Sequence, residues 1–315
     1  MSQRRNAVLA ALLAAALACQ PAAARSARAG ETFQFGVIGH SFQSGPDDSE
    51  LRQAIRDTNQ ANLAFVVATG IKADSESCSD KLYARRVELL DESEWPLVVS
   101  LAASDWSGCK NSAGRSNAID RLNRLRELFF ADDNSLGARK LALARLSANA
   151  KFRSYAENSQ WESGRVLFAT INLPANNNHF LPEAGRNSEF EDRLVANRSW
   201  LQRLFAAAQR KKLDGIVLFS DGDVGVQNED ERSLLPSFNT KQDGFAVMRR
   251  QIRTLAKKFS GKVLLIDTKR GKNPPAPAIE WNDNLGHVSV NAGWVRIQVN
   301  PGRANLFDIK NGEAQ

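Results

Sequence analysis

The chain has 315 residues, of which 43% are hydrophobic and 24% are charged, and its formal net charge is +7. This composition is typical of a globular protein with enough apolar residues for one sizeable core. It therefore excludes the class of proteins that lack a hydrophobic core. The basic stretches at 210–212, 249–258 and 269–272 carry no interleaved aromatic residues, so nucleic acid is not an expected partner. Solvated helix faces explain these stretches most simply, and attraction to anionic envelope components or phosphate-containing ligands is the alternative.

The first residues have the order of a secretory signal peptide. Arg4 and Arg5 precede an apolar stretch at 7–18, and small residues follow up to position 24. The apolar stretch is shorter than the roughly 20 residues that a membrane-spanning helix needs, and no later segment is long and apolar enough. We therefore expect residues 1–24 to be a signal peptide and the mature protein to be exported, either periplasmic or secreted. Cys19 leaves open the alternative of a lipoprotein.

Removal of this leader leaves two cysteines, Cys78 and Cys109. An even number of cysteines in an oxidising compartment predicts a disulfide. In the chain-entropy model, closing this loop stabilises the fold by roughly 3–4 kcal/mol.

The mature chain alternates apolar strands with amphipathic helices. In chain order, the pattern predicts a strand at 33–38, a helix at 48–60, a strand at 63–68, a helix at 79–90, a strand at 97–101, a helix at 118–130, a strand at 166–171, a helix at 190–212, a strand at 215–219, a helix at 245–259 and a strand at 262–266. Segments 287–290, 294–299 and 306–309 alternate in polarity and are joined by tight turns, which predicts antiparallel strands.

This order favours an α/β fold whose parallel strands carry ligands at their carboxyl ends, together with a second or mixed sheet. No linker divides the chain, so a single domain is expected over 31–310. Residues 131–160 lack a clear period and are expected to form a cap or insertion over one end of the sheet. Residues 287–310 are expected to close the domain with antiparallel strands.

Several stretches in series carry a resemblance to one family. They are CSDKLYARR at 78–86, LFFADDNSLG at 128–137, Glu157-Asn158 with Trp161 and 166–170, and AGWVR at 292–296. Together these stretches resemble the exported, bacterial type of calcineurin-like metallophosphoesterase over residues 33–310. The resemblance implies two mixed β-sheets packed face to face as a sandwich and flanked by helices. It also implies phosphoester hydrolysis by two metal ions held at the strand tips.

The ligand positions of this family are degenerate in this chain. They are occupied by His40, Gly70, Ser104, Asp267 and Gly271. The family pattern has an aspartate in place of His40, the metal-bridging aspartate in place of Gly70 and an asparagine in place of Ser104. Asp267 and Gly271 stand where a histidine pair is expected, and Asp223 alone is retained as a candidate ligand.

Without the bridging carboxylate, two divalent cations would repel each other at a cost of several kcal/mol in a partly buried site. We therefore expect a metallophosphoesterase-like protein that has lost two-metal hydrolysis, has no catalytic residues, needs no cofactor and acts as a binding or scaffold protein. The alternative is a phosphoesterase that uses a single divalent metal or a rearranged ligand set. His40, Asp105, Asp223 and Asp267 are its candidate ligands, because such ions bind imidazole and carboxylate groups together.

The remaining polar candidates have simpler interpretations. His179 lies among asparagines and is expected to be an ordinary loop residue, and His287 is expected to have a structural role in an antiparallel strand. Ser104 has no base positioned beside it in the sequence, so it is not an expected nucleophile. The stretch Asp221-Gly222-Asp223 resembles only part of a calcium-binding loop.

Overall fold

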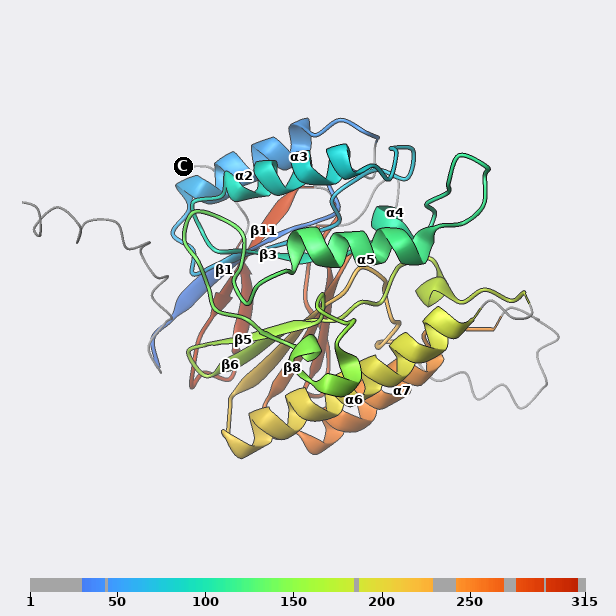
Figure 1. The fold of residues 1–315 in the computed structure, drawn as a ribbon. Coiled ribbons are helices and arrows are strands. Elements are labelled where there is room, and N and C mark those ends of the chain that lie inside the picture. Colours follow the sequence, from blue (N-terminus) through green and yellow to red (C-terminus); the bar gives the residue numbers. More distant parts are fainter. Residues whose placement is uncertain are drawn as a thin grey trace, which may run out of the picture.

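The computed structural model describes residues 30–42, 45–183, 187–228, 242–268, 276–291 and 293–310. The expected signal peptide at 1–24, Cys19, Gly271 and the basic stretch at 269–272 lie outside the described residues. Two mixed β-sheets pack face to face, and helices cover both outer faces (Figure 1). The expected α/β sandwich flanked by helices is therefore confirmed.

The first sheet has the strand order β12-β11-β1-β2-β3. Its strands are β1 (Phe33–Ile38), β2 (Val66–Thr69), β3 (Leu97–Ser100), β11 (Trp294–Val299) and β12 (Phe307–Lys310). Strands β1, β2 and β3 are parallel, whereas β11 is antiparallel to β1 and to β12. The tips of three parallel strands therefore meet at one edge of this sheet.

The second sheet has the strand order β4-β5-β6-β7-β8-β10-β9. Its strands are β4 (Ala144–Arg145), β5 (Ser159–Ser163), β6 (Val166–Thr170), β7 (Gly215–Phe219), β8 (Lys262–Asp267), β9 (Glu280–Asn282) and β10 (Leu285–Ser289). The central strands β6, β7 and β8 are parallel and almost entirely buried, which agrees with their unbroken apolar sequences.

One predicted strand has a different partner from the one expected. The strand predicted at 287–290 corresponds to β10, which pairs in parallel with β8 and in antiparallel fashion only with the short strand β9. It lies in the second sheet, whereas the next strand, β11, lies in the first. The interpretation of His287 as a residue of a closing antiparallel strand is therefore corrected: β10 extends the parallel sheet beside β8.

The space between the sheets is filled by aromatic and branched side chains from both. The Phe168 ring of β6 lies 5.3 Å from Phe35 of β1 and 4.9 Å from Phe65, and Phe65 lies 5.3 Å from Trp161 of β5. All of these side chains are buried in one cluster. This cluster fixes the two sheets against each other.

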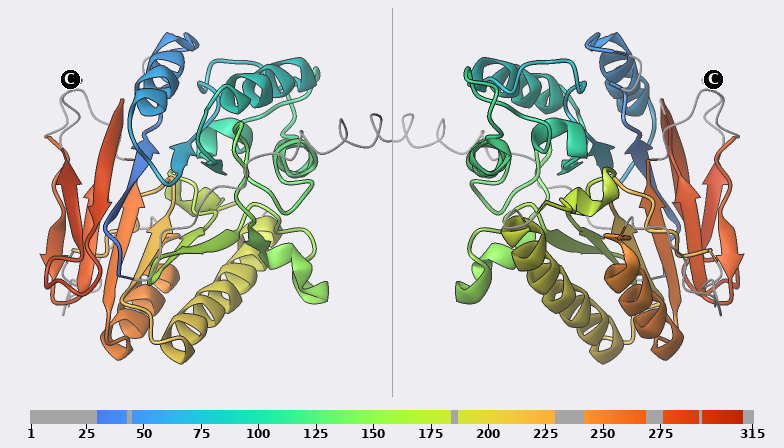
Figure 2. Two further views of the ribbon diagram at one scale, coloured as in Figure 1. Left: turned by 90° about the vertical axis from the view of Figure 1, so that its left-hand side faces the viewer. Right: turned by 90° about the vertical axis from the view of Figure 1, so that its right-hand side faces the viewer.

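Each outer face has its own helical layer, as the side views show (Figure 2). The first sheet is covered by α2 (Ser49–Gln60), α3 (Asp80–Asp91) and α5 (Ala118–Phe129), and the second by α6 (Ser188–Arg210) and α7 (Ala246–Lys258). Short helical turns complete the fold: α4 (Ala103–Trp106), η1 (Leu146–Ala148), η2 (Ala150–Phe152) and η3 (Asn177–His179).

The segment at 131–160 runs along the edges of both sheets. The backbone of Leu136 exchanges two hydrogen bonds of 2.8 Å with Leu97 of β3. Further along, β4 pairs with β5 at the outer edge of the second sheet. This segment therefore joins the β3 edge of one sheet to the β4 edge of the other.

Candidate functional site

The strand tips of the first sheet form a buried network, the tip network, which consists of His40, Gly70, Lys72, Ser104 and Asp105. His40 follows β1 and Ser104 follows β3, and the Nε2 atom of His40 lies 2.7 Å from the hydroxyl of Ser104. The structure thus places a base beside Ser104, contrary to the interpretation drawn from the sequence. The exposed fractions of His40 and Ser104 are only 1% and 3%. The hydrogen bond between these two buried side chains joins the tips of β1 and β3.

Gly70 is in contact with the ring of His40. Its φ angle of +74° lies in the left-handed region, which favours glycine. A Cβ atom built at this position would lie 2.4 Å from Cδ2 and 2.7 Å from Nε2 of His40. The imidazole therefore occupies the space into which a side chain at position 70 would extend, at the position where the resemblance implies a bridging carboxylate.

Asp105 is fully buried, and the backbone already occupies both of its carboxylate oxygens. One oxygen accepts a hydrogen bond from the amide of Ile71 at 2.9 Å, and the other accepts one from the amide of Ala102 at 2.7 Å. Burial raises the pKa of Asp105 to about 7, with a smaller contribution from Asp221, against the opposing effect of these two amides. The carboxyl group holds the tips of β2 and β3 together.

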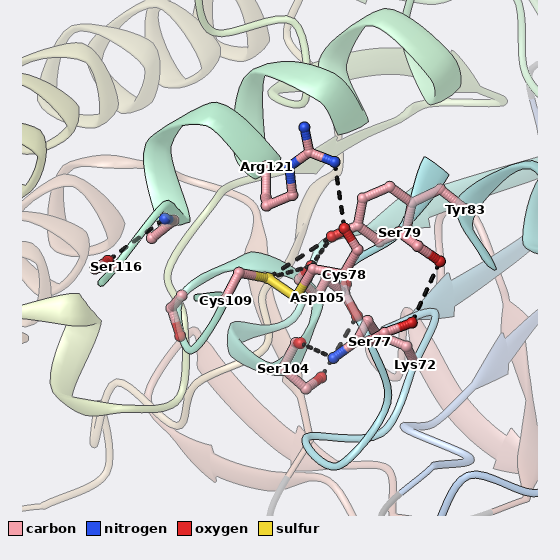
Figure 3. Close-up of a disulfide and its surroundings, with 12 residues drawn as sticks. Lys72, Ser77, Cys78, Ser79, Tyr83, Ser104, Asp105, Cys109, Ser116 and Arg121 are labelled. Carbon is pink, nitrogen blue, oxygen red and sulfur yellow. Dashed lines mark hydrogen bonds between the residues drawn. A yellow bond between two sulfur atoms is a disulfide. The ribbon is translucent and has the colours of Figure 1, made fainter. Parts of the chain in front are cut away.

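Lys72 is the cation of the tip network. Its ammonium donates to the backbone oxygens of Ser104 and Ala73 at 2.7 and 2.6 Å, as seen in Figure 3 for Ser104. Burial lowers the pKa of Lys72, and the charge of Asp105 opposes that shift. The lysine therefore fixes the loop after β2 to α4.

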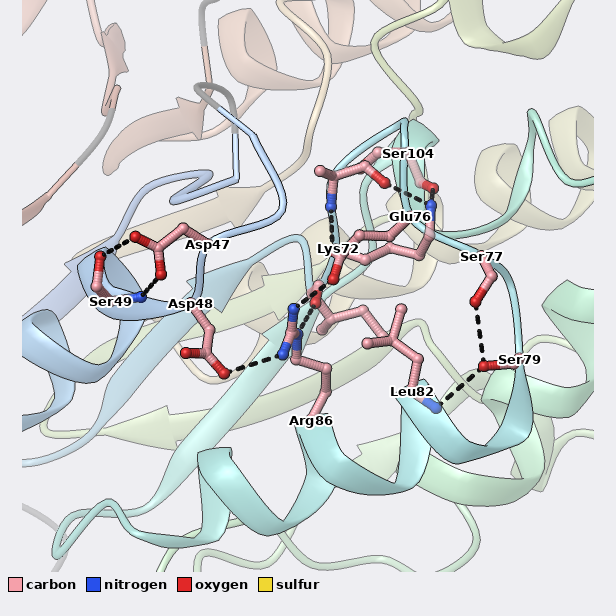
Figure 4. Close-up of polar contacts among 12 residues, drawn as sticks. Asp47, Asp48, Ser49, Lys72, Glu76, Ser77, Ser79, Leu82, Arg86 and Ser104 are labelled. Atoms are coloured by element: carbon pink, nitrogen blue, oxygen red, sulfur yellow. Dashed lines mark hydrogen bonds and ion pairs between the residues drawn. The ribbon is translucent and has the colours of Figure 1, made fainter.

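Arg86 of α3 fixes the same loop from the other side (Figure 4). Its guanidinium donates to the oxygen of Ile71 at 2.7 Å and pairs with Glu76 at 2.9 Å and Asp48 at 3.2 Å. Glu76 in turn accepts a hydrogen bond from the amide of Ala73. The loop that begins at Gly70 is thus bonded at Ile71, Ala73 and Glu76.

The expected disulfide between Cys78 and Cys109 is confirmed. It joins the loop before α3 to the turn after α4, close to Tyr83, whose hydroxyl donates to the oxygen of Asp105 at 2.7 Å (Figure 3). The covalent bond therefore connects the loop that begins at Gly70 to the segment that contains α4 and Ser104.

Asp221 connects three strand tips, although the sequence indicated only an incomplete calcium loop there. One of its oxygens accepts hydrogen bonds from the amides of Ala103 at 2.7 Å and Ala175 at 2.8 Å. The other accepts one from the hydroxyl of Thr268 at 3.1 Å. These contacts link the loops after β3, β6 and β8. No periodicity in the sequence signals this role.

A second group of polar residues, the Asp–His cluster, consists of Asp223, Asp267 and His287. The Nε2 atom of His287 lies 2.7 Å from Asp267 and 3.8 Å from Asp223, and one ligand atom from each residue lies within 4.8 Å of the others. Ser289 donates to the second oxygen of Asp267 at 2.6 Å. Burial disfavours the imidazolium, but the hydrogen bond to Asp267 and the charges of Asp267 and Asp223 outweigh it and raise the pKa of His287.

The Asp–His cluster can hold a divalent cation. Mixed carboxylate and imidazole ligands suit such an ion. The side chain of Asp267 is fully buried, that of His287 is 12% exposed and that of Asp223 is 34% exposed. A cation bound here would therefore keep access to solvent on the side of Asp223.

The candidate single-metal ligands fall into two groups. His40 and Asp105 belong to the tip network, whereas Asp223 and Asp267 belong to the Asp–His cluster. Among the residues that the structure describes, the Asp–His cluster is the one group of at least three residues with metal-ligand geometry. His287 takes part in it, although only a structural role was expected for this residue. The pairing of β10 with β8, which places Ser289 opposite Asp267, creates this neighbourhood.

His179 is a buried residue in a left-handed turn. Asn177, Asn178 and His179 have φ angles of 55°, 55° and 50°. Arg193 and the backbone of Gly244 hold the turn through hydrogen bonds to the asparagines. The His179 ring packs edge-on against Trp106 at 4.8 Å. It is therefore more tightly packed than the ordinary loop residue that the sequence predicted.

No protein-family model matches this chain, and a comparison with curated proteins finds no match. Two crystal structures are similar at a low level. TT1561 of Thermus thermophilus aligns over 89% of this chain and 99% of its own, with 9% identity and a TM-score of 0.47. A structure described as a novel phosphatase from Mycoplasma pneumoniae aligns over 89% and 92%, with 9% identity and a TM-score of 0.44. At these values neither likeness carries an argument about the site of this chain.

Within the described ranges, no helix combines the length and the apolar character needed to cross a membrane.

Proposed function

We propose that this chain is an exported protein on a metallophosphoesterase-like scaffold that no longer hydrolyses phosphoesters with two metals and acts by binding. The observation that carries this proposal is the contact between His40 and Gly70. A side chain at position 70 would begin 2.4 Å from the His40 ring, so an imidazole fills the space that the resemblance assigns to the bridging ligand.

The surrounding groups support the same conclusion. Both oxygens of Asp105 already accept backbone hydrogen bonds, and the Lys72 ammonium is buried in the same network. Two neighbouring divalent cations would have to approach this lysine without a carboxylate between them. The Coulomb repulsion would exceed the attraction to the remaining ligands.

Hydrolysis assays test this proposal directly. Purified mature protein is incubated with manganese and bis(p-nitrophenyl) phosphate, with and without a chelator. We expect the rate of hydrolysis to equal that of buffer with manganese alone. Robust turnover that disappears with the chelator would overturn the proposal.

A single-metal phosphoesterase is the second candidate, and the Asp–His cluster is the observation that favours it. An ion bound by Asp223, Asp267 and His287 would be open to solvent next to the partly exposed Asp223. The cluster lies at the carboxyl ends of β7, β8 and β10, where parallel sheets bind ligands.

Elemental analysis separates the two candidates. The single-metal enzyme predicts stoichiometric metal in the purified chain, together with loss of both metal and phosphodiesterase activity in His287→Ala. The matched control is His179→Ala, which removes a buried imidazole outside the cluster. A chain without metal, or equal metal content in the two variants, rules out the second candidate.

Export is part of the proposal and rests on the order of residues 1–24 and on the disulfide. Disulfides persist in oxidising compartments. Cell fractionation of a tagged chain is expected to place the mature form outside the cytoplasm. Release from membranes in Cys19→Ala would instead identify a lipoprotein.

A further inference from the structure

A groove of about 720 Å³ lies at the end of the second sheet opposite the Asp–His cluster. It is found where β7 and β8 begin, whereas Asp223 and Asp267 follow the ends of these strands. Segments that are distant in sequence form its walls: 209–214, 258–262, 283–284 and 302–306. The helices α6 and α7 end beside this groove, at the lower edge of the molecule in Figure 1.

Cations dominate the charge of the groove. Its cationic lining residues are Lys212, Lys258, Lys262 and Arg303, and its acidic ones are Asp214 and Asp283. The carboxylate of Asp214 is already paired with Arg165 outside the groove, at 3.0 and 3.1 Å. Within the described part of the chain, none of the four cations forms an ion pair with a carboxylate. The groove therefore has an excess of positive charge.

Compensation of the negative helix ends would be a simpler role for these cations, because the last carbonyl groups of a helix attract them. Neutral amides already donate to several carbonyls at the ends of both helices. The side-chain amide nitrogen of Asn284 lies 2.9 Å from the oxygens of Ala256, Phe259 and Gly261 and shares its two hydrogens among them. Gln209 donates to the oxygen of Lys258 at 3.1 Å. The ammonium and guanidinium groups are therefore not needed as helix caps.

One of the cations is held in place within the groove. The ammonium of Lys262 donates to the oxygen of Asp283 at 3.2 Å and lies 4.9 Å from the centre of the Trp281 ring. Lys212 has a φ angle of +51°, which directs the chain sharply from α6 into β7. A ligand that enters the groove thus meets charges on a largely fixed backbone.

We propose that this groove binds a multiply charged anion with phosphate groups. Lysine and arginine are the usual partners of phosphate oxygens, and a concave surface with charge of one sign concentrates ions of the other. The phosphates belong either to a soluble phosphate ester or to the headgroup of an anionic lipid. This inference goes beyond the proposed function, because anion binding here does not depend on what happens at the strand tips.

Titration calorimetry with pyrophosphate tests the site. The groove variant carries Lys212→Gln, Lys258→Gln, Lys262→Gln and Arg303→Gln. The control variant carries Lys81→Gln, Arg85→Gln, Lys110→Gln and Arg153→Gln, which removes the same charge from exposed positions outside the groove. We expect the dissociation constant to rise at least about tenfold in the groove variant and less than about twofold in the control, in low salt where charges are weakly screened.

Vesicle sedimentation distinguishes the two sources of phosphate. Phosphatidylcholine vesicles with and without phosphatidylglycerol are mixed with each protein, and pyrophosphate is added as a competitor. Groove-dependent sedimentation only with phosphatidylglycerol assigns a lipid headgroup, and groove-dependent binding of pyrophosphate alone assigns a soluble ester. Either result supports the site.

The proposal fails if the wild-type chain binds neither ligand, or if the control variant loses as much affinity as the groove variant. Circular dichroism shows whether the groove variant is folded. If it is not, the pair Lys212→Gln and Arg303→Gln replaces it, because both side chains are exposed. Unchanged affinity in this folded pair likewise overturns the proposal.

Discussion

At the residue scale, the ring of His40 and the absent side chain of Gly70 are complementary in shape. The left-handed backbone at position 70 and the imidazole beside it leave room only for a hydrogen atom. His40 is in turn held by the hydroxyl of Ser104 at 2.7 Å. The two positions are thus coupled by packing, although they are far apart in the sequence.

Gly70→Asp is therefore expected to be strongly destabilising. The variant suffers both the left-handed φ and the clash with His40, and overpacking of this kind costs about 1–3 kcal/mol beyond the backbone strain. Gly114→Asp is the matched control, because Gly114 has a φ of +73° and nothing within 4 Å of its Cβ position. Urea unfolding measures the difference, and equal losses in the two variants would contradict the packing argument.

The same coupling predicts partial rescue. In the double variant that carries Gly70→Asp and His40→Ala, the side chain at position 70 no longer clashes with an imidazole ring at position 40. The double variant is then expected to be more stable than the sum of the single changes by about 1–3 kcal/mol. A double-mutant cycle gives this coupling energy, and additive effects would show that the two side chains do not compete for space.

Asp105 gives the tip network a pH dependence. Its pKa is about 7 in the folded protein, against an ordinary value of 3.8. An acid with a raised pKa binds its proton more tightly when folded, so the free energy of unfolding decreases as pH rises from about 4 to 7. The difference between these two pKa values corresponds to about 4 kcal/mol in the free energy of unfolding. Asp221 raises this pKa and Lys72 opposes it.

Asp105→Asn is expected to remove this contribution. The free energy of unfolding in urea is measured for the variant and for the wild-type chain at pH 5 and pH 8. The contributions of all other titrating groups cancel in the difference between the two proteins. The stability advantage of the wild-type chain should be smaller at pH 8, because the buried carboxylate is then charged. An advantage that grows with pH would mean that the backbone amides and Lys72 outweigh burial.

At the scale of secondary structure elements, two long-range links hold the loop after β2. The disulfide joins Cys78 to Cys109 across a sequence separation of 31 residues. Arg86 of α3 binds Ile71, Glu76 and Asp48. Because the guanidinium is buried, loss of either carboxylate would leave part of its charge uncompensated. These links hold the tips of β2 and β3 in register with α3.

Replacement of both cysteines by serine is expected to lower the free energy of unfolding by about 3–4 kcal/mol, because the unfolded chain gains the entropy of the open loop. The reduced wild-type chain should show the same loss, and a reducing agent should leave the serine variant unchanged. An equal effect of the reductant on both proteins would mean that it acts elsewhere.

At the scale of the whole molecule, the central cluster belongs to both sheets. Phe168 contacts Phe35 of the first sheet, Phe65 directly before β2, and Trp161 of the second sheet. Neither sheet can separate without exposing these rings to water. The two sheets are therefore expected to unfold as one unit.

Phe168→Ala tests this cooperativity. Loss of this ring from the centre of the cluster is expected to cost about 3–5 kcal/mol. Far-ultraviolet circular dichroism and tryptophan fluorescence should shift together during urea unfolding and give one midpoint. Separate midpoints for the two signals would show that the sheets unfold independently.

Much of the architecture could be predicted from the sequence. The strands at 33–38, 215–219 and 294–299 and the five main helices follow from apolar periodicity, which is a property of neighbouring residues. The loss of a bridging carboxylate at Gly70 stays a prediction, because it depends on the resemblance alone. The cysteine count in a chain with an expected leader was enough to predict the disulfide.

The neighbours of each strand could not be predicted in the same way. His287 joins Asp267 because β10 leaves the closing strands and pairs with β8, and this choice depends on packing between distant segments. Local periodicity gives the conformation of a segment but not its partner in a sheet. The sequence by itself thus determined the elements and the disulfide. Only the tertiary structure decided that the His40 ring lies against Gly70, that Asp223, Asp267 and His287 form one cluster and that four distant segments form a cationic groove, since side chains far apart in the chain meet only when the core packs.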